Sequence, residues 1–178
     1  MSTHVSESDL SLTPAQQKLC DLWEKHTRHE FVDKSVDATM ETMIEGAYVN
    51  NVPTMMGGEG LAGVRNFYTH VFIPTLPPDT ETVLISRTVG KTQIVDELIF
   101  KFTHTIAMEW MLPGVKPTGK PVEVALVVIV GFREGKISHE HIYWDQASIL
   151  VQLGLLDKMS LPVAGVESAR KMACHIKQ

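Results

Sequence analysis

The sequence predicts an α+β domain in which about three N-terminal helices pack on a strongly curved, mostly antiparallel sheet, followed by a C-terminal helix. Two observations carry this prediction. Apolar residues recur with helical spacing up to Pro74, and from Thr82 onward β-branched and aromatic residues dominate. Tight glycine-containing turns at 90–92 and 133–136 separate the later segments as hairpins do.

The first helix is expected to begin at Pro14, because Thr13 is a good N-cap and proline suits the first helical turn. Its apolar spacing extends to about residue 29. A second, short helix should contain residues 40–44. A third should cover 61–73, between the glycine-rich turn at 57–60 and Pro74, which stops it.

Strand-forming residues predict the sheet. A short strand is expected at 48–52, and longer strands at 83–89, 94–106, 122–132 and 137–144. Asp145 should begin a closing helix that Gly154 ends. These limits divide the chain into a flexible tail (1–12), one domain (13–157) and a C-terminal extension (158–178).

Composition narrows the possible partners. Of 178 residues, 44% are apolar and 21% are charged, which is typical of one globular domain. The net charge of -5 and the scattered basic residues argue against nucleic acid. The apolar runs are too short for a bilayer, so we expect no membrane partner and a cytoplasmic protein. Cys20 and Cys174 lie far apart, which favours reduced thiols over a disulfide or metal framework.

Two segments carry a family resemblance. Residues 135–154 read GKISHEHIYWDQASILVQLG, and residues 57–68 read GGEGLAGVRNFY. Both resemble the SnoaL-like polyketide cyclases and isomerases of the NTF2-like superfamily, and the resemblance covers roughly residues 14–156. It implies a cone-shaped NTF2-like fold around one apolar pocket. It also implies acid/base chemistry without a metal or organic cofactor, and a homodimer formed through the open sheet face.

The function implied is that of a cofactor-independent isomerase, cyclase, or hydratase/lyase acting on a small hydrophobic carbonyl compound. A non-catalytic, homodimeric ligand-binding module is an alternative, because this fold hosts unrelated activities. A third is a lactone hydrolase of the dienelactone type. The chain lacks the G-x-S-x-G nucleophile elbow usual in that last class.

Three residues are candidate catalytic groups. Asp145 matches the family's acid/base carboxylate, although an aspartate at this place also makes a helix N-cap. His104 shares a strand face with Phe100 and Phe102 by two-residue alternation and would act as acid or oxyanion partner, or else be structural. Glu97 has the opposite parity and joins them only if a bulge shifts the register.

Other residues are expected to bind substrate or support the site. Asn50 and Asn51 fall on the first strand, where related proteins frequently carry a histidine. An asparagine can orient a carbonyl but cannot relay a proton. Glu140 and His141 are expected behind the catalytic groups. His139 and His141 alone are a weak metal signature, so no metal is expected. The candidate substrate-binding residues are Tyr48, Asn51, Phe100, Phe102, Trp110, Tyr143 and Trp144.

Overall fold

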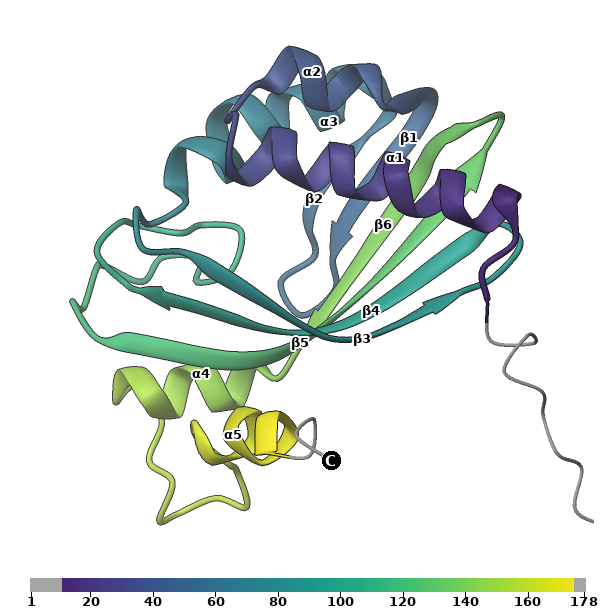
Figure 1. The fold of residues 1–178 in the computed structure, drawn as a ribbon. Coiled ribbons are helices and arrows are strands. Elements are labelled where there is room, and N and C mark those ends of the chain that lie inside the picture. Colours follow the sequence, from purple (N-terminus) through teal and green to yellow (C-terminus); the bar gives the residue numbers. More distant parts are fainter. Residues whose placement is uncertain (1–10, 175–178) are drawn as a thin grey trace, which may run out of the picture.

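The computed structural model describes residues 11–174 and has the expected α+β organisation, with a six-stranded curved sheet and helices at both ends of the chain (Figure 1). Of the expected N-terminal tail, residues 1–10 lie outside the described part. Within residues 11–174, no helix combines the length and apolar character needed to cross a membrane.

Helix α1 (Pro14–Phe31) begins where the sequence predicts. The Thr13 side chain accepts from the Gln16 backbone N–H, and the Gln16 side chain accepts from the Thr13 N–H, so the two form a capping box. One face of α1 is buried against the sheet. That face carries the ionisable His26 and Glu30 as well as apolar residues.

Three further segments complete the layer of helices beside α1. Helix α2 (Val36–Glu41) is capped by Ser35, whose hydroxyl accepts from the Ala38 N–H. Helix α3 (Gly60–Phe67) continues into a π-helical turn, η2 (Tyr68–Phe72), and a 3₁₀ turn, η3 (Ile73–Thr75). The π turn interrupts α-helical spacing and places Tyr68 and Phe72 toward the core.

The sheet has the strand order β2-β1-β6-β5-β4-β3. All neighbours pair antiparallel except β1 and β6, which run parallel. The strands are β1 (Met43–Asn51), β2 (Met56–Glu59), β3 (Glu81–Val89), β4 (Gln93–Thr103), β5 (Pro121–Arg133) and β6 (Lys136–Trp144).

Helices cover both sides of this sheet. Helices α1, α2 and α3 lie over its concave face, whereas α4 (Gln146–Leu153) and α5 (Glu167–Cys174) lie on the opposite side, against β5 (Figure 1). Glu123 of β5 joins this second layer, because its backbone hydrogen-bonds the Gln152 side chain and its carboxylate pairs with Arg170. The C-terminal extension therefore packs on the sheet through α5.

Four sequence predictions need correction in detail. Met43 and Ile44 belong to β1 instead of the second helix, because Met43 pairs with Ile137 of β6. The expected glycine turn contains strand β2, which pairs with β1. The strand expected at 94–106 ends at Thr103, before His104. Helix α5 was not expected within the extension at all.

Candidate functional site

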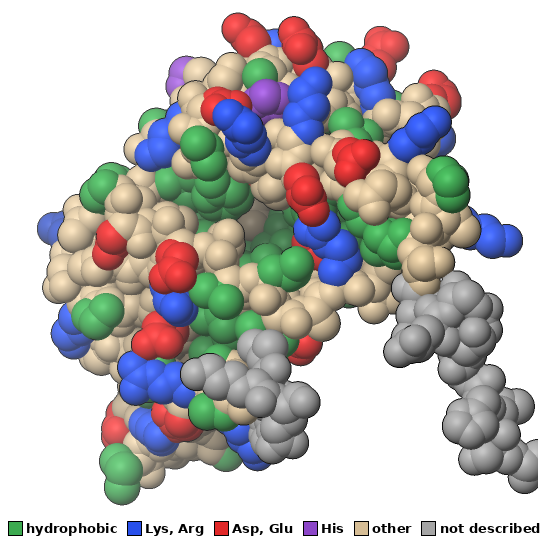
Figure 2. Space-filling model, viewed as in Figure 1, with side chains coloured by type: hydrophobic (Ala, Val, Ile, Leu, Met, Phe, Trp, Pro, Cys, Tyr) green, Lys and Arg blue, Asp and Glu red, His purple; other side chains and the backbone are tan. Residues whose placement is uncertain are grey.

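A cavity of about 170 Å³ lies between the concave face of the sheet and the helices above it. Figure 2 shows the molecule hollowed at this level, with hydrophobic side chains inside and charged side chains of both signs beside the opening. The apolar and aromatic residues that line it are Trp23, Phe31, Val49, Phe67, Phe72, Leu84, Leu98, Phe100, Trp110, Leu126, Val128 and Ile142. A concave, mainly apolar space with few polar groups is the usual form of a small-molecule site.

Two groups of polar side chains interrupt this lining. Glu30, Tyr68 and Glu140 form the first group, and Arg87 and Asp96 form the second. Asn51 also reaches the cavity; its amide donates to the Met56 carbonyl at 3.1 Å.

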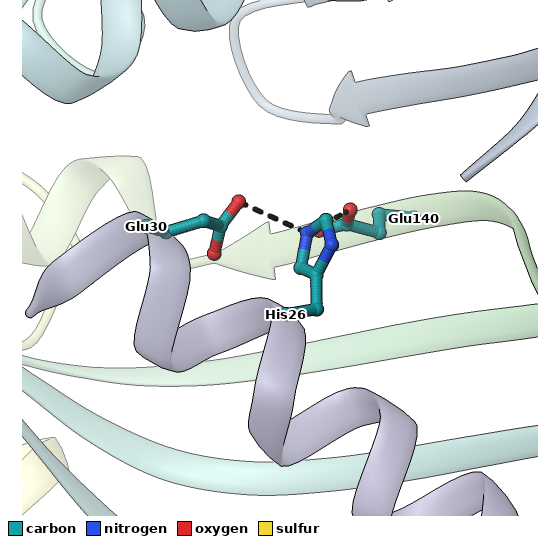
Figure 3. Close-up of side chains that lie close together, drawn as sticks. All are labelled: His26, Glu30 and Glu140. Carbon is teal, nitrogen blue, oxygen red and sulfur yellow. Dashed lines mark ion pairs between the residues drawn. The ribbon is translucent and has the colours of Figure 1, made fainter. Parts of the chain in front are cut away.

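The first group converges on His26, which lies fully buried behind it (Figure 3). The His26 Nε2 atom is 3.2 Å from Glu30 Oε1 and 3.1 Å from Glu140 Oε1. The Tyr68 hydroxyl donates to Glu140 Oε1 at 3.0 Å and lies 3.3 Å from His26 Nε2. His26 and Glu30 lie one turn apart on α1, so helical spacing places both side chains on the face that packs against Glu140 of β6.

The other nitrogen of the His26 ring is also fixed. The Thr42 hydroxyl donates to the Thr39 carbonyl at 2.6 Å, so its oxygen accepts from His26 Nδ1–H, also at 2.6 Å. The Trp23 ring stacks on the imidazole, with centroids 5.5 Å apart. These contacts hold the ring so that Nε2 faces the two carboxyl groups.

Protonation follows from this geometry. Burial by itself would lower the pKa of His26, but the adjacent Glu30 and Glu140 carboxylates outweigh it and raise that pKa to about 10. Burial raises the pKa of Glu30, and His26 partly offsets this. Burial, with the nearby carboxylates, also raises the pKa of Tyr68. At neutral pH His26 is therefore an imidazolium beside two carboxyl groups, of which Glu30 binds a proton more readily than an ordinary glutamate.

The second group is an ion pair in the cavity wall. Arg87 donates to both oxygens of Asp96, from Nε at 2.7 Å and from NH2 at 2.9 Å. The Trp23 indole N–H donates to Asp96 at 2.7 Å, and Arg87 also binds Glu24. The hydrogen bonds that Arg87 donates to Asp96 are the main cause that raises the Arg87 pKa above its ordinary value. Trp23 therefore contacts both polar groups, stacking on His26 and donating to Asp96.

The His26 cluster is also the one place among residues 11–174 where side chains could hold a metal ion. Ligand atoms of His26, Glu30 and Glu140 all lie within 4.8 Å of one another. A divalent ion with nitrogen and oxygen ligands suits such a set. The same atoms are already satisfied by their mutual hydrogen bonds and ion pairs, so the arrangement does not depend on a metal.

The structure brings some of the expected site residues together and separates others. Four of them line the cavity: Asn51, Phe100, Trp110 and Glu140. Phe102 and Trp144 are buried in the core beside it, where Trp144 packs edge-on against Trp110. Tyr48, His141 and Tyr143 have the opposite strand parity and lie on the convex face, where the Tyr48 hydroxyl bonds His141 Nε2 at 2.8 Å.

None of the three expected catalytic residues lines the cavity. Asp145 is exposed and is the N-cap of α4, accepting from the Ser148 N–H at 3.2 Å. His104 is fully buried just beyond β4, where its backbone anchors the following loop at Thr118, Gly119 and Lys120. The Glu97 carboxylate accepts from the Ser86 hydroxyl on the neighbouring strand β3. Its side chain lies on the opposite face of the sheet from Asp96.

Sequence reasoning did not single out His26, Glu30 and Tyr68, although a signal for two of them was present. His26 and Glu30 fall at helical spacing from Trp23, on the stripe that the periodicity marks as buried. Ionisable residues on a buried stripe need partners, which makes them candidates for a polar centre. Tyr68 lies in the third expected helix (61–73), and no local pattern indicates that its hydroxyl meets these two residues.

Comparisons with known proteins agree with this fold. The family model described as SnoaL-like polyketide cyclase matches residues 17–153. No curated protein matches the chain significantly.

Solved structures resemble the chain at low identity. TsrD from Streptomyces laurentii is 18% identical with a TM-score of 0.60, covering 82% of this chain and all of its own. A protein with a ketosteroid isomerase-like fold from Catenulispora acidiphila, in complex with trimethylamine, is 11% identical with a TM-score of 0.60 and coverages of 82% and 96%. The epoxide hydrolase/cyclase-like enzyme SalBIII, which has a role in pyran ring formation in the polyether salinomycin, is 16% identical with a TM-score of 0.52 and coverages of 74% and 90%. These likenesses show the fold.

Proposed function

The chain belongs to the SnoaL-like polyketide cyclase family, and from this premise we propose that it is a cofactor-independent isomerase or cyclase for a small hydrophobic carbonyl compound bound in the cavity. One observation carries the proposal. Two buried carboxyl groups, Glu30 and Glu140, stand in the wall of an otherwise largely aromatic cavity with His26 fixed behind them. Perturbed ionisable groups in a cleft are characteristic of acid/base sites.

The proposed chemistry begins with proton removal. Glu140, held by Tyr68 and His26, takes a proton from the carbon next to the substrate carbonyl, and the C–H electron pair forms an enolate. The Tyr68 hydroxyl, which also lines the cavity, donates a hydrogen bond to the enolate oxygen once Glu140 is protonated, and Glu140 returns its proton at another carbon. His26 acts as a positioning residue, because it touches both carboxyl groups but does not line the cavity.

The Asp96 group supports the cyclase form of the reaction. A ring closure needs an acid at one substrate position and a base at another. Asp96 supplies a third carboxyl group in the wall of the same cavity, set apart from Glu30 and Glu140 by its pairing with Arg87. The likeness to SalBIII is consistent with ring formation in this fold.

The test is solvent exchange followed by NMR in deuterated water, with a panel of cyclic ketones, enones and lactones. We expect the wild-type protein to place deuterium in at least one compound, and Glu140→Gln to slow this by about 10²-fold or more. Glu134→Gln is the matched control, because Glu134 is exposed in the hairpin before β6. Lactone opening would appear in the same spectra as a hydroxy acid.

Asp145→Asn is measured in parallel, because Asp145 remains a predicted catalytic residue. If exchange is lost in Asp145→Asn and kept in Glu140→Gln, the base is at the start of α4 and the present assignment is wrong. If no compound exchanges with wild type while several still shift protein resonances, the protein is a ligand-binding module.

We further propose that the protein is a homodimer formed through the convex face of the sheet. On this face the rings of Tyr48, His139 and His141 lie against one another with centroids 4.9–5.4 Å apart, and those of Tyr48 and His139 are stacked. Tyr143 is 41% exposed on the same face. Exposed aromatic surface of this kind is typical of interfaces. Analytical ultracentrifugation at micromolar concentration should give a dimer, and a monomer would contradict the proposal.

A further inference from the structure

We propose that the ligand of this cavity carries an alkylated ammonium group. The inference names the charge of the substrate, and it rests on the proposed function only in taking the cavity as the ligand site.

Four aromatic rings in the cavity wall form a closed circuit of contacts. Phe31 packs against Phe72 and Phe100, and Trp110 packs against the same two rings. Neighbouring centroids are 5.0–6.4 Å apart and each pair is edge-to-face. All four rings line the cavity. Alkylammonium groups bind to such clusters because the face of an aromatic ring carries partial negative charge.

The cavity also has more negative than positive charge. Its lining includes the carboxyl groups of Glu30, Asp96 and Glu140 but a single cationic side chain, Arg87. Counting the imidazolium of His26 behind the wall, one carboxyl group remains without a cation. A buried charge without a partner is unfavourable, so this carboxyl group binds either a proton or a cationic ligand.

Glu30 fits the role of that carboxyl group. It is 3% exposed, lines the cavity, and follows directly before Phe31, so it lies at the edge of the aromatic cluster. Burial is the main cause that raises the pKa of Glu30, so its ionised carboxylate is unfavourable there unless a cation lies beside it. A bound ammonium group would take the place of this proton.

Anionic ligands do not fit the same cavity. Arg87 is the one cation in its wall, and three of its nitrogens already donate to Asp96 and Glu24. An anion would have to compete with these carboxylates and would approach Glu30 and Glu140. Electrostatic repulsion therefore excludes carboxylate and phosphate ligands.

The test compares choline with its neutral isostere 3,3-dimethylbutan-1-ol at pH 7, by NMR titration of the full chain. The two have the same shape, so any difference in Kd reports the charge. We expect choline to bind at least about tenfold more tightly, because a desolvated cation–π interaction contributes on the order of 2 kcal/mol. Acetate is included and should not bind.

Two variants and two controls locate the effect. Phe72→Leu keeps apolar volume but removes a ring, and Glu30→Gln removes the charge. Each variant should reduce the preference for choline by about tenfold and change the Kd of the neutral isostere by no more than about twofold. Phe102→Leu is the control for the ring, because Phe102 is buried beside Phe100 but does not line the cavity. Glu134→Gln is the control for the charge.

Equal or tighter binding of the neutral isostere overturns the inference, as does no binding of choline at about 100 mM. An unchanged preference in both Phe72→Leu and Glu30→Gln also overturns it. Because these titrations need no turnover, they are independent of the exchange assay. Selective choline binding without exchange would keep this inference and contradict the proposed function, whereas exchange without selectivity would do the reverse.

Discussion

At the scale of single residues, His26 sets the electrostatics of the cavity. Its imidazolium donates to Thr42 on one side and faces Glu30 and Glu140 on the other. A buried cation between two carboxyl groups is stable only while every partner remains. This residue therefore couples protonation of the site to stability of the fold.

We expect the His26 ring to stay protonated far above the pH at which free histidine titrates, because both neighbouring carboxylates favour the charged form. NMR of the ring carbons across pH 5–11 should give a midpoint of about 10. The pKa is higher in the folded than in the unfolded state. The His26 contribution to the free energy of unfolding is thus complete below about pH 6.5 and is lost as the pH rises to about 10.

The His26→Gln variant is the control for this titration, because it lacks the His26 ring. A His26 midpoint near 6.5, or unfolding that depends on pH equally in wild type and His26→Gln between pH 6.5 and 10, would contradict the assignment.

At the scale of elements, the ends of helices and strands decide where side chains point. On β6 the alternation places Glu140 and Ile142 in the cavity wall. The strand ends at Trp144, so Asp145 begins the next element and its side chain is used to cap α4. The same change of element explains His104, which follows the last paired residue of β4.

Replacing Asp145 separates its role as a cap from any catalytic role. Asp145→Ala should lower the free energy of unfolding by about 1 kcal/mol, because it removes the acceptor for the Ser148 N–H, whereas Asp145→Asn keeps an acceptor and should change it little. Urea denaturation measures both. Equal loss in the two variants would show that the charge matters more than the hydrogen bond.

The approach of α3 to β2 depends on glycine. A Cβ atom at Gly58 would lie 2.3 Å from the backbone oxygen of Gly63, so Gly58→Ala must push the helix away from the strand. We expect a loss of about 1–3 kcal/mol in unfolding free energy, as for other overpacked sites. Gly46→Ala is the matched control, since its Cβ would meet nothing nearer than Arg133 at 4.0 Å. Similar effects of the two substitutions would contradict this explanation.

At the scale of the whole molecule, the cavity exists because a curved sheet and a layer of helices enclose a space that their side chains do not fill. Helix α1 spans the concave face and brings His26 and Glu30 over β6 (Figure 1). The second layer, α4 and α5, lies on the other side of the sheet and leaves this cavity open.

Removal of metal ions should leave the whole protein active. We expect dialysis against EDTA to keep the rate of deuterium exchange within about twofold, because the proposed chemistry uses Glu140 for proton transfer and the Tyr68 hydroxyl as hydrogen-bond donor. Elemental analysis of the purified protein is the second readout. A loss of exchange that zinc or manganese restores would instead assign the His26 cluster as a metal site.

Local sequence patterns specify the α+β class, most strand positions and the parity of β4 and β6. These follow from local causes: the Thr13 cap, the β-branched runs after Thr82 and the two-residue alternation that put Asp96, Leu98 and Phe100 on one face. Short-range rules also offered capping as the alternative role for Asp145. Local rules failed where strand-pairing partners lie far apart in the sequence. Met43 is an example, because its partner Ile137 lies in the last strand.

Which groups meet in the cavity depends on the tertiary structure. His26 and Glu30 share one helix, but Tyr68 and Glu140 reach them from a π-helical turn and from the last strand. No local pattern specifies that meeting, because it depends on how α1 crosses the curved sheet. The same holds for the pKa of His26, which is raised by carboxylates placed beside it by folding.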